Sequence, residues 1–158
     1  MTFTSFHSPL GELTLVADPD GVLRGLYFPG TAPALPAADN DPEPLAAATE
    51  QLEQYFRGER TQFELALDYG GTPFQHSVWD ALREIPYGET TTYGTLARRL
   101  DAQPRAVGAA VGATPIPIIV PCHRVIGSDG SLTGYGGGLP RKRALLDLEA
   151  GVLTLAPA

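Results

Sequence analysis

The chain has 158 residues, of which 43% are hydrophobic and 18% charged, and its formal net charge is −7. This composition predicts a folded globular protein of one ordinary or two small domains, and no apolar stretch approaches the roughly 20 residues that a membrane helix needs. The N-terminus lacks the basic region and apolar block of a signal peptide, and the chain holds one cysteine. We therefore expect a cytoplasmic protein with neither an internal disulfide nor a cysteine-rich zinc site.

The charge is unevenly distributed along the chain. Residues 1–70 contain 11 acidic and 3 basic side chains, a formal charge of −8, whereas residues 71–158 contain 7 acidic and 8 basic ones, a charge of +1. Electrostatic repulsion keeps a polyanion away from the first part. If the protein binds nucleic acid, we expect residues 71–158 to bind it.

Residues 1–70 have the pattern of a small α/β domain. Three segments rich in β-branched, aromatic and leucine residues, separated by turn signals, predict antiparallel strands at 2–7, 11–17 and 22–28. A loop rich in Pro, Ala and Asp follows at 30–44, and the apolar spacing from Pro44 to about Arg57 predicts a helix. The alternation of Phe63, Leu65 and Leu67 predicts one more strand.

Residues 71–158 are predicted to form a mostly helical domain. A helix begins with Thr72 as cap, Pro73 in the first turn and Gln75 placed for a capping box. Its buried stripe is expected to hold Phe74, Val78, Ala81, Leu82 and Ile85, with Trp79 beside it in the core. Two short helices at 92–100 and 105–112, joined by a turn at 101–104, suggest a helix-turn-helix.

The second of these short helices carries almost no side chains. Ala106, Gly108, Ala109, Ala110 and Gly112 make it small, although each glycine costs about 1 kcal/mol against alanine. Small residues suit a place where another backbone comes very close. One interpretation is tight packing against a neighbouring helix, and the other is a fit into a narrow DNA groove, which Arg105 at the helix start favours.

The most informative segment surrounds the single cysteine. The apolar run Ile118-Ile119-Val120 reads as a buried strand that Pro121 ends, and Cys122-His123-Arg124 follow at once. Only a thiolate attacks, and neighbouring His and Arg side chains stabilise a thiolate, so Cys122 is a candidate nucleophile. The alternative, a buried cysteine that acts as a small hydrophobe, is equally favoured by the local sequence.

Two further features follow Cys122. A hairpin turn is predicted at 127–130, and residues 132–138 form a glycine-rich loop around Tyr135, which either brings backbone amides to a ligand or serves as a flexible linker. The last helix is predicted from about Pro140 to Ala150 and has Arg141, Lys142 and Arg143 in its first turn. Positive charge there opposes the helix dipole and is best tolerated beside a phosphate or carboxylate.

Together these segments resemble the O6-alkylguanine-DNA alkyltransferase family. The resemblance rests on TPFQHSVWDALREIPYGETTTYGTLA, RAVGAAVG, IPIIVPCHRVIGSDGSLTGYGGG and KRALLDLE within residues 72–149, with SPLGELTLVAD and YFRGE similar to the family's variable first domain. It implies a small α/β domain at 1–70, an antiparallel sheet with a helix, joined to a mostly α domain with a helix-turn-helix at 71–158. The implied activity is DNA repair by irreversible, single-turnover transfer of an alkyl group from O6-alkylguanine, and also from O4-alkylthymine, to a cysteine of the protein.

The resemblance also implies roles for individual residues. Cys122 would accept the alkyl group, His123 would be its base through a water molecule, and Glu149 would orient His123. Tyr93 would rotate the nucleotide and Arg105 would fill the gap in the base stack. Further contacts to the DNA or the flipped base would come from Thr114, Pro117, Val125, Tyr135 and Gly136. No cofactor and no metal are implied, and the partner is double-stranded DNA that carries O6-alkylguanine.

Two departures from the family pattern concern DNA binding. Thr114 stands where the family usually has an asparagine that ties the active-site turn to the recognition helix, so we expect that turn to be held less firmly. The segment between Tyr93 and Arg105 is shorter than usual by about two residues, with Asp101 where glycine is expected. Both departures affect the expected DNA affinity more than the thiol chemistry.

Two other functions are compatible with this fold. A non-catalytic protein that binds alkylated lesions is one alternative, but such relatives lack the cysteine. A thiol hydrolase that turns over through Cys122, His123 and Glu149 is the other, and adjacent Cys and His side chains usually point in different directions. We expect a monomer, and the sequence leaves open whether it binds cooperatively along DNA.

Overall fold

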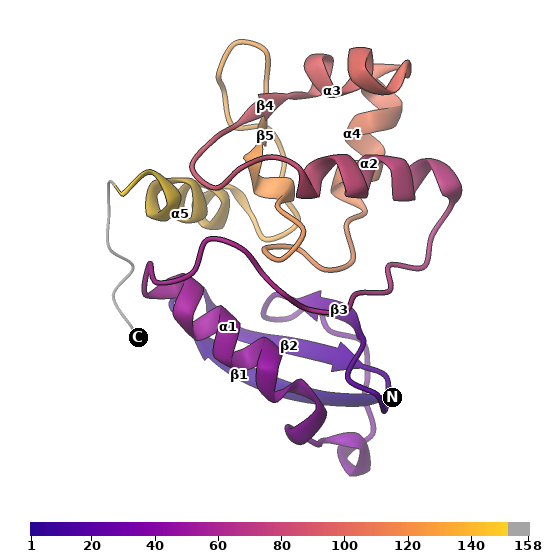
Figure 1. Cartoon of the computed structure of the whole chain (residues 1–158), viewed down its shortest axis with the longest axis vertical. Helices are drawn as coiled ribbons and strands as arrows, with labels where there is room; N and C mark the ends of the chain where they lie inside the picture. Colours follow the sequence, from indigo (N-terminus) through magenta and orange to yellow (C-terminus); the bar gives the residue numbers. More distant parts are fainter. Residues whose placement is uncertain (152–158) are drawn as a thin grey trace. The chain divides into compact units, whose positions relative to one another are not determined.

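The computed structural model describes residues 1–151 (Figure 1). The described chain forms two compact units, Met1–Gly70 and a second one that begins at Gly71. The first contains a three-stranded antiparallel sheet and a helix, and the second is mostly helical, so the predicted fold class is confirmed. Residues 152–158 of the expected second domain lie outside the described residues.

The first unit is a sheet with one helix packed on it. Its elements are β1 (Thr2–Ser8), β2 (Gly11–Ala17), β3 (Leu23–Tyr27), the 3₁₀ turns η1 (Ala37–Asp39) and η2 (Glu43–Leu45), and α1 (Ala46–Phe56), with the strands in the order β1-β2-β3. Leu13, Leu15 and Leu52 are completely buried, and the rings of Phe6 and Phe56 stack between β1 and α1 at 6.4 Å. The three predicted strands and the predicted helix are confirmed to within about two residues at each end.

The strand predicted at 63–67 is wrong. Only Leu67 makes an isolated bridge, to Leu23, where the Leu23 amide donates to the Ala66 carbonyl at 2.9 Å. The backbone of Glu64 is instead held by the side-chain amide of Gln51 on α1, which donates at 3.2 Å and accepts at 2.9 Å. The alternation of apolar residues was correct, but a side chain occupies the place of a neighbouring strand.

The second unit contains five helical elements and a short parallel strand pair among its described residues. They are α2 (Pro73–Arg83), β4 (Thr91–Thr92), α3 (Tyr93–Leu100), α4 (Pro104–Gly112), η3 (Cys122–Arg124), β5 (Val125–Ile126) and α5 (Leu139–Ala150). Helices α2, α3 and α4 pack on one another, and α5 packs against η3 (Figure 1). The segment η3, which contains the candidate nucleophile Cys122, therefore lies between a helical cluster and the last helix of the same unit.

The start of α2 is formed as the sequence predicts. The Thr72 hydroxyl accepts from the Gln75 amide at 3.1 Å and the Gln75 side chain accepts from the Thr72 amide at 2.9 Å, which completes the capping box. Trp79 is buried, and its indole donates to the Ala110 carbonyl of α4 at 2.8 Å. Phe74 was expected in the buried stripe but is 37% exposed, because the covered face of α2 begins one turn later, at Val78.

Helices α3 and α4 form the predicted helix-turn-helix. Thr92 caps α3 by accepting from the Thr95 amide at 3.1 Å, and α3 ends at Asp101, whose φ of 52° and ψ of 51° are left-handed. Glycine and, next to it, Asn or Asp tolerate that conformation, so Asp101 can replace the glycine expected at this position. The turn between α3 and α4 is short, because α4 already starts at Pro104.

The strand pair β4–β5 was not predicted. Thr91 pairs with Val125 and Thr92 with Ile126 in parallel, immediately before α3 and immediately after η3. The predicted turn at 127–130 is present, with the Gly130 amide donating to the Gly127 carbonyl at 2.9 Å, but β5 pairs with β4 and with no returning strand in the described chain. This pairing fixes η3 beside the first residue of the helix-turn-helix.

The buried strand predicted at 118–120 is also wrong. These residues are buried but form a tight turn in which the Val120 amide donates to the Ile116 carbonyl at 2.9 Å. Prolines at 115, 117 and 121 lack the amide donors that a strand ladder needs. Ile118 takes a φ of 73°, a strained conformation for a β-branched side chain, and such strain collects at functional sites.

Candidate active site

The single cysteine of the chain stands at the end of this turn. Cys122 opens η3 directly after Pro121, and its amide donates to the Val120 carbonyl at 2.8 Å. The residue is buried, with 5% of its surface exposed. The Thr114 and Tyr135 side chains lie close enough to the Cys122 side chain to act on the pKa of its thiol. The segment after α4, η3 and the glycine-rich loop therefore meet at the thiol.

The thiol is protonated in the resting protein. Burial raises the pKa of Cys122 to about 11, although its hydrogen bonds and the positive charge of Lys142 act in the opposite direction. The expectation that His123 and Arg124 stabilise a thiolate stays a prediction, and in this structure both side chains bind Glu149.

A buried network of charged groups joins η3 to α5. Glu149 Oε2 lies 2.7 Å from Nε2 of His123, and Arg124 donates from Nε to Oε1 at 2.7 Å and from Nη2 to Oε2 at 2.9 Å. Burial raises the pKa of the Glu149 carboxyl, but the hydrogen bonds and charges of His123 and Arg124 outweigh it and lower that pKa to about 2. Glu149 is therefore ionised at neutral pH, and it is not an exposed partner of the charges at 141–143.

The geometry fixes the protonation pattern of His123. The side chain is completely buried, and burial lowers its pKa even though the hydrogen bond to Glu149 raises it. A neutral imidazole beside an ionised carboxylate donates its Nε2–H to that carboxylate. Nδ1 then keeps a lone pair, and it has no hydrogen-bond partner among the described residues. His123 is thus a neutral base with one nitrogen held and the other available.

Arg124 belongs to this charged network, a role that the sequence did not predict. Besides its two bonds to Glu149, its Nη1 donates to the Ile85 carbonyl at 2.6 Å, at the end of α2. Its guanidinium lies 5.8 Å from the centre of the Tyr87 ring. Arg124 therefore anchors the carboxylate to two elements of the unit, and no local sequence signal connects positions 124 and 149.

The burial of Lys142 on α5 was not predicted from the sequence either. It is completely buried, its Nζ donates to the Thr133 carbonyl at 3.0 Å, and its charge acts on Cys122. The helical spacing of Leu145 and Leu148, three and six residues further along the buried face, could have placed Lys142 on the covered side of α5.

The residues predicted to contact DNA lie on separate elements. Tyr93 is the first residue of α3, and a Cβ added at Gly108 of α4 would lie 3.9 Å from its ring. Arg105, in the first turn of α4, is exposed and makes no hydrogen bond or ion pair with the described residues. The Thr114 hydroxyl donates to the Val111 carbonyl in the last turn of α4 at 2.7 Å. Of these three, only Thr114 touches the thiol.

The other residues predicted to contact the flipped nucleobase lie before and after Cys122 in the sequence. Pro117 and Val125 are buried, with Pro117 bridged to Val120. Gly136 is exposed, and a Cβ there would meet nothing within 4 Å. Of the glycine-rich loop, Tyr135 is the residue that contacts the Cys122 side chain.

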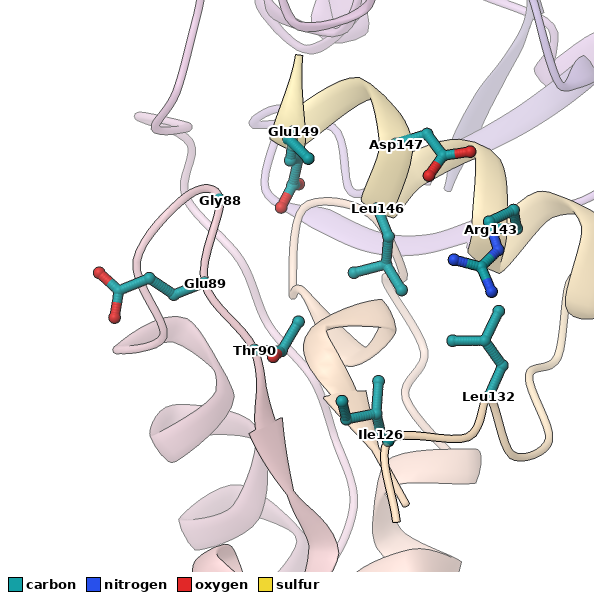
Figure 2. A pocket seen from close by; sticks show the side chains of 11 residues that line it. Gly88, Glu89, Thr90, Ile126, Leu132, Arg143, Leu146, Asp147 and Glu149 are labelled. Carbon is teal, nitrogen blue, oxygen red and sulfur yellow. The ribbon is translucent and has the colours of Figure 1, made fainter. Parts of the chain in front are cut away.

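A pocket of about 250 Å³ lies beside Glu149 but away from the thiol (Figure 2). Ile126, Leu132 and Leu146 form its apolar part, and Arg143 and Asp147 of α5 line the same pocket. Neither Cys122 nor any predicted base contact lines it, so it is not a place where a substrate could reach the sulfur.

Two features are absent from residues 1–151. No group of three or more His, Cys, Asp and Glu side chains there is arranged to hold a metal ion. None of the described helices is long and apolar enough to cross a membrane.

Comparison with known proteins identifies the family to which the chain belongs. Residues 73–151 match the DNA-binding domain of 6-O-methylguanine DNA methyltransferase, and residues 1–69 match its ribonuclease-like domain. The chain belongs to the 6-O-methylguanine DNA methyltransferase family. It is 50% identical over 155 residues to the methylated-DNA–protein-cysteine methyltransferase of Mycobacterium bovis, with 93% of this chain and 91% of that protein covered. The enzyme of the same name from Methanosarcina acetivorans is 46% identical, with 94% and 98% covered.

Solved structures of the family have the same fold. The crystal structure of Mycobacterium tuberculosis OGT in complex with DNA is similar with a TM-score of 0.89 and 49% identity, covering 100% of this chain and 96% of that one. The O6-methylguanine-DNA methyltransferase of Pyrococcus kodakaraensis is similar with a TM-score of 0.73 and 27% identity, covering 94% and 99%. The family predicted from the sequence is confirmed.

Proposed function

We propose that this protein repairs DNA by taking the alkyl group from O6 of an alkylated guanine onto Cys122, once per molecule. The observation that carries the proposal is the pairing of a single protonated thiol with a neutral histidine whose Nε2 is held by Glu149 and whose Nδ1 is available. A thiol of this kind needs a base at the moment of attack, and His123 is the base that the neighbouring segment supplies.

The reaction is one in-line displacement. The Cys122 S–H proton passes through a water molecule to Nδ1 of His123, and the sulfur lone pair forms a bond to the alkyl carbon. The bond between that carbon and O6 breaks, and its electron pair stays on guanine, which takes up a proton and leaves. Tyr135 and the Gly136 amide lie against the base and its O6, and hydrogen bonds to O6 make guanine a better leaving group. O4-alkylthymine offers the same carbon–oxygen bond.

The products explain why the protein acts once. The carbon–sulfur bond of the thioether is stable because its cleavage would expel a thiolate, a poor leaving group from an alkyl carbon, and the sulfur has lost the proton that made base catalysis useful. The reaction needs no cofactor, because the thiol supplies the nucleophile and the proton. The protein is thus both enzyme and reactant, and it is consumed in proportion to the lesions that it repairs.

The helix-turn-helix supplies the contact with double-stranded DNA. Added Cβ atoms at Gly108 and Gly112 of α4 would meet either ordinary contact or open space, so the protein's own core does not demand glycine there. This favours an external surface that must come close, such as a DNA groove, over tight helix packing. Tyr93 turns the nucleotide out, and Arg105 takes its place in the stack.

The lesion-binding and hydrolase alternatives are less well supported. A lesion binder has no use for a thiol beside a poised base, and a hydrolase would need a second nucleophile to release the thioether. The proposal includes a cytoplasmic monomer, since a reducing compartment keeps the thiol free.

The test is the intact mass of the protein after incubation with duplex DNA that contains one O6-methylguanine. A gain of one CH₂ unit per molecule, in proportion to lesions removed, supports the proposal. An unchanged mass despite tight binding would support the lesion binder. Guanine product in excess of protein would support the hydrolase.

Arg105→Ala is expected to slow repair in duplex DNA by at least about tenfold and to leave the reaction with the free base O6-benzylguanine nearly unchanged, because only the duplex leaves a gap to fill. The measurement is the single-turnover rate with each substrate. Arg57→Ala, which removes the same charge from α1's C-terminal end, is the matched control and should change neither rate. Equal losses on both substrates would contradict a role in nucleotide flipping.

A further inference from the structure

The glycine-rich loop at residues 132–138 loses much conformational entropy when it is held in one conformation. Four of its seven residues are glycines, and glycine loses more conformational freedom on ordering than any other residue. Gly138 takes a φ of 89°, and a Cβ at Gly134 or Gly136 would meet nothing within 4 Å. Packing around these glycines therefore does not fix the loop, and a contact from outside it is needed.

The first turn of α5 supplies such a contact. Arg141 reaches back and donates from Nη1 to the Gly137 carbonyl, four residues earlier, at 3.0 Å. The backbone ladder of α5 starts only at the next carbonyl, that of Gly138, which accepts from the Lys142 amide at 3.1 Å. Within residues 1–151, the Arg141 side chain thus provides the one hydrogen bond of the Gly137 backbone. A side chain of the helix therefore holds the loop where the helix ladder does not reach.

The held carbonyl lies next to the residues of the proposed chemistry. Tyr135 lies close enough to the Cys122 side chain to act on the pKa of its thiol. The Tyr135 carbonyl accepts from the Gly138 amide at 2.9 Å, which closes residues 135–138 into one turn. Gly136 is exposed in this turn, and its amide is the proposed donor to O6 of guanine. The conformation of the turn decides where that amide points.

We propose that Arg141 is a positioning residue: by holding the Gly137 carbonyl, it keeps the turn at 135–138 in the conformation that receives the flipped guanine. The inference rests on the proposed function, in which Tyr135 and the Gly136 amide contact that base. Arg141 takes no part in making or breaking bonds, and it sets the fraction of molecules whose loop is ready before the base arrives. A positive charge in the first turn of a helix opposes the helix dipole, and this role gives a reason for its presence.

This role predicts a particular kinetic signature. When only a fraction of the molecules has the binding-competent loop, the apparent dissociation constant rises by the inverse of that fraction, and the bound complex is unchanged. Loss of the Arg141 contact should therefore raise the half-saturating concentration of a guanine substrate and leave the limiting rate of transfer nearly unchanged. A residue that only stabilises the fold would change neither value in the folded molecules, and a residue that contacts the reacting atoms would lower the limiting rate.

The experiment compares wild type with Arg141→Met, Arg141→Lys and Arg143→Met, with the free base O6-benzylguanine as substrate so that attraction of DNA phosphates plays no part. We expect Arg141→Met to raise the half-saturating concentration by about tenfold and to change the limiting rate by less than about twofold. Arg141→Lys should recover part of the loss, because an ammonium group can donate to the same carbonyl.

Arg143→Met is the matched control, because it removes the same charge from the same helix. Arg143 is exposed and forms no hydrogen bond or ion pair with the described residues. Its half-saturating concentration should equal that of wild type. An unchanged value in Arg141→Met, or an equal rise in Arg143→Met, would overturn the inference.

The Gly138 amide reports on the turn without any substrate. Its exchange with solvent deuterium requires the hydrogen bond to the Tyr135 carbonyl to open. We expect this exchange to be about tenfold faster in Arg141→Met than in wild type, and unchanged in Arg143→Met. Equal exchange in wild type and Arg141→Met would contradict a loop held by Arg141.

A measurement on wild type covers the case in which Arg141→Met does not fold. A guanidinium held by a carbonyl rotates slowly about its Cζ–Nη bonds, so NMR should resolve the Nη signals of Arg141 and average those of Arg143. Averaged signals at both residues would overturn the inference. Neither amide exchange nor the guanidinium signals use DNA. A failed mass test with a held loop would therefore reject alkyl transfer and not the loop contact, whereas a successful mass test with a free loop would reject the role of Arg141 alone.

Discussion

A chain that carries Cys122→Ser is expected to bind alkylated duplex DNA and to take up no alkyl group. The sequence contains no other cysteine, so the acceptor is removed outright. A serine hydroxyl is a far weaker acid than a thiol, and burial, which already raises the pKa of the thiol to about 11, raises the cost of an alkoxide further. His123 is a neutral base of lowered pKa and cannot take that proton. The intact mass after incubation should therefore stay that of the unmodified chain.

Cys122→Ser also tests whether alkyl transfer is lost because the nucleophile is absent or because the fold is disturbed. The serine hydroxyl is slightly smaller than the thiol and has the polar side chains of Thr114 and Tyr135 beside it, so we expect the thermal unfolding temperature and the affinity for lesion-containing duplex to remain near wild type. A mass gain in Cys122→Ser would place the acceptor on another residue. Lost DNA binding together with lost transfer would show that the substitution disturbs the second unit as a whole.

Local sequence signals were sufficient where neighbouring residues decide the structure. The strands β1 to β3 and the capping box of α2 depend on alternation, turn residues and a cap within three or four positions, and the structure contains them. The strands expected at 63–67 and 118–120 failed because their outcome depends on what lies across from them. Gln51 takes the backbone of Glu64, and prolines around Ile118 turn the chain back.

Local sequence signals were also insufficient to predict the chemistry of the candidate site. The roles of His123 and Glu149 came from the family resemblance, since 26 residues separate them and no periodicity connects them. The sequence placed positive charges beside Cys122 and suggested a thiolate. It could not show that Arg124 turns to Glu149, nor that desolvation dominates at the sulfur. Burial is a property of the assembled unit, and it raises the pKa of the Cys122 thiol.

A protonated resting thiol has a functional advantage in a protein that reacts once. A free thiolate would be consumed by oxidants and soluble alkylating agents before it met a lesion. In the proposed mechanism, burial at Cys122 suppresses that loss, and His123 acts as the base when a substrate is bound. The reaction rate would then depend on the network that orients His123, of which Glu149 is the centre.

Glu149→Gln is expected to slow alkyl transfer by about a hundredfold and to destabilise the fold by about 3 kcal/mol at neutral pH. The amide cannot orient and polarise His123 as a carboxylate does, and it leaves the buried Arg124 charge without a counter-charge. The rate is measured in a single turnover with methylated duplex, and the free energy by chemical unfolding. Asp147→Asn, the same charge change two residues earlier on α5, is the matched control and should alter both values little.

The pH dependence of stability separates this role from a general loss of packing. The pKa of Glu149 is 4.5 in the reference state and falls to about 2 in the folded protein. A lowered carboxyl pKa gives stability that is fully present above pH 4.5 and is lost as the pH falls toward 2. Wild type should therefore lose about 3 kcal/mol across that window, from Glu149 alone, and Glu149→Gln should lack this part of the decline. Parallel stability curves for the two chains between pH 5 and 2 would contradict an ionised, paired Glu149. They would also remove the reason to regard His123 as the base, because only an ionised carboxylate fixes the proton on Nε2 and leaves Nδ1 to act.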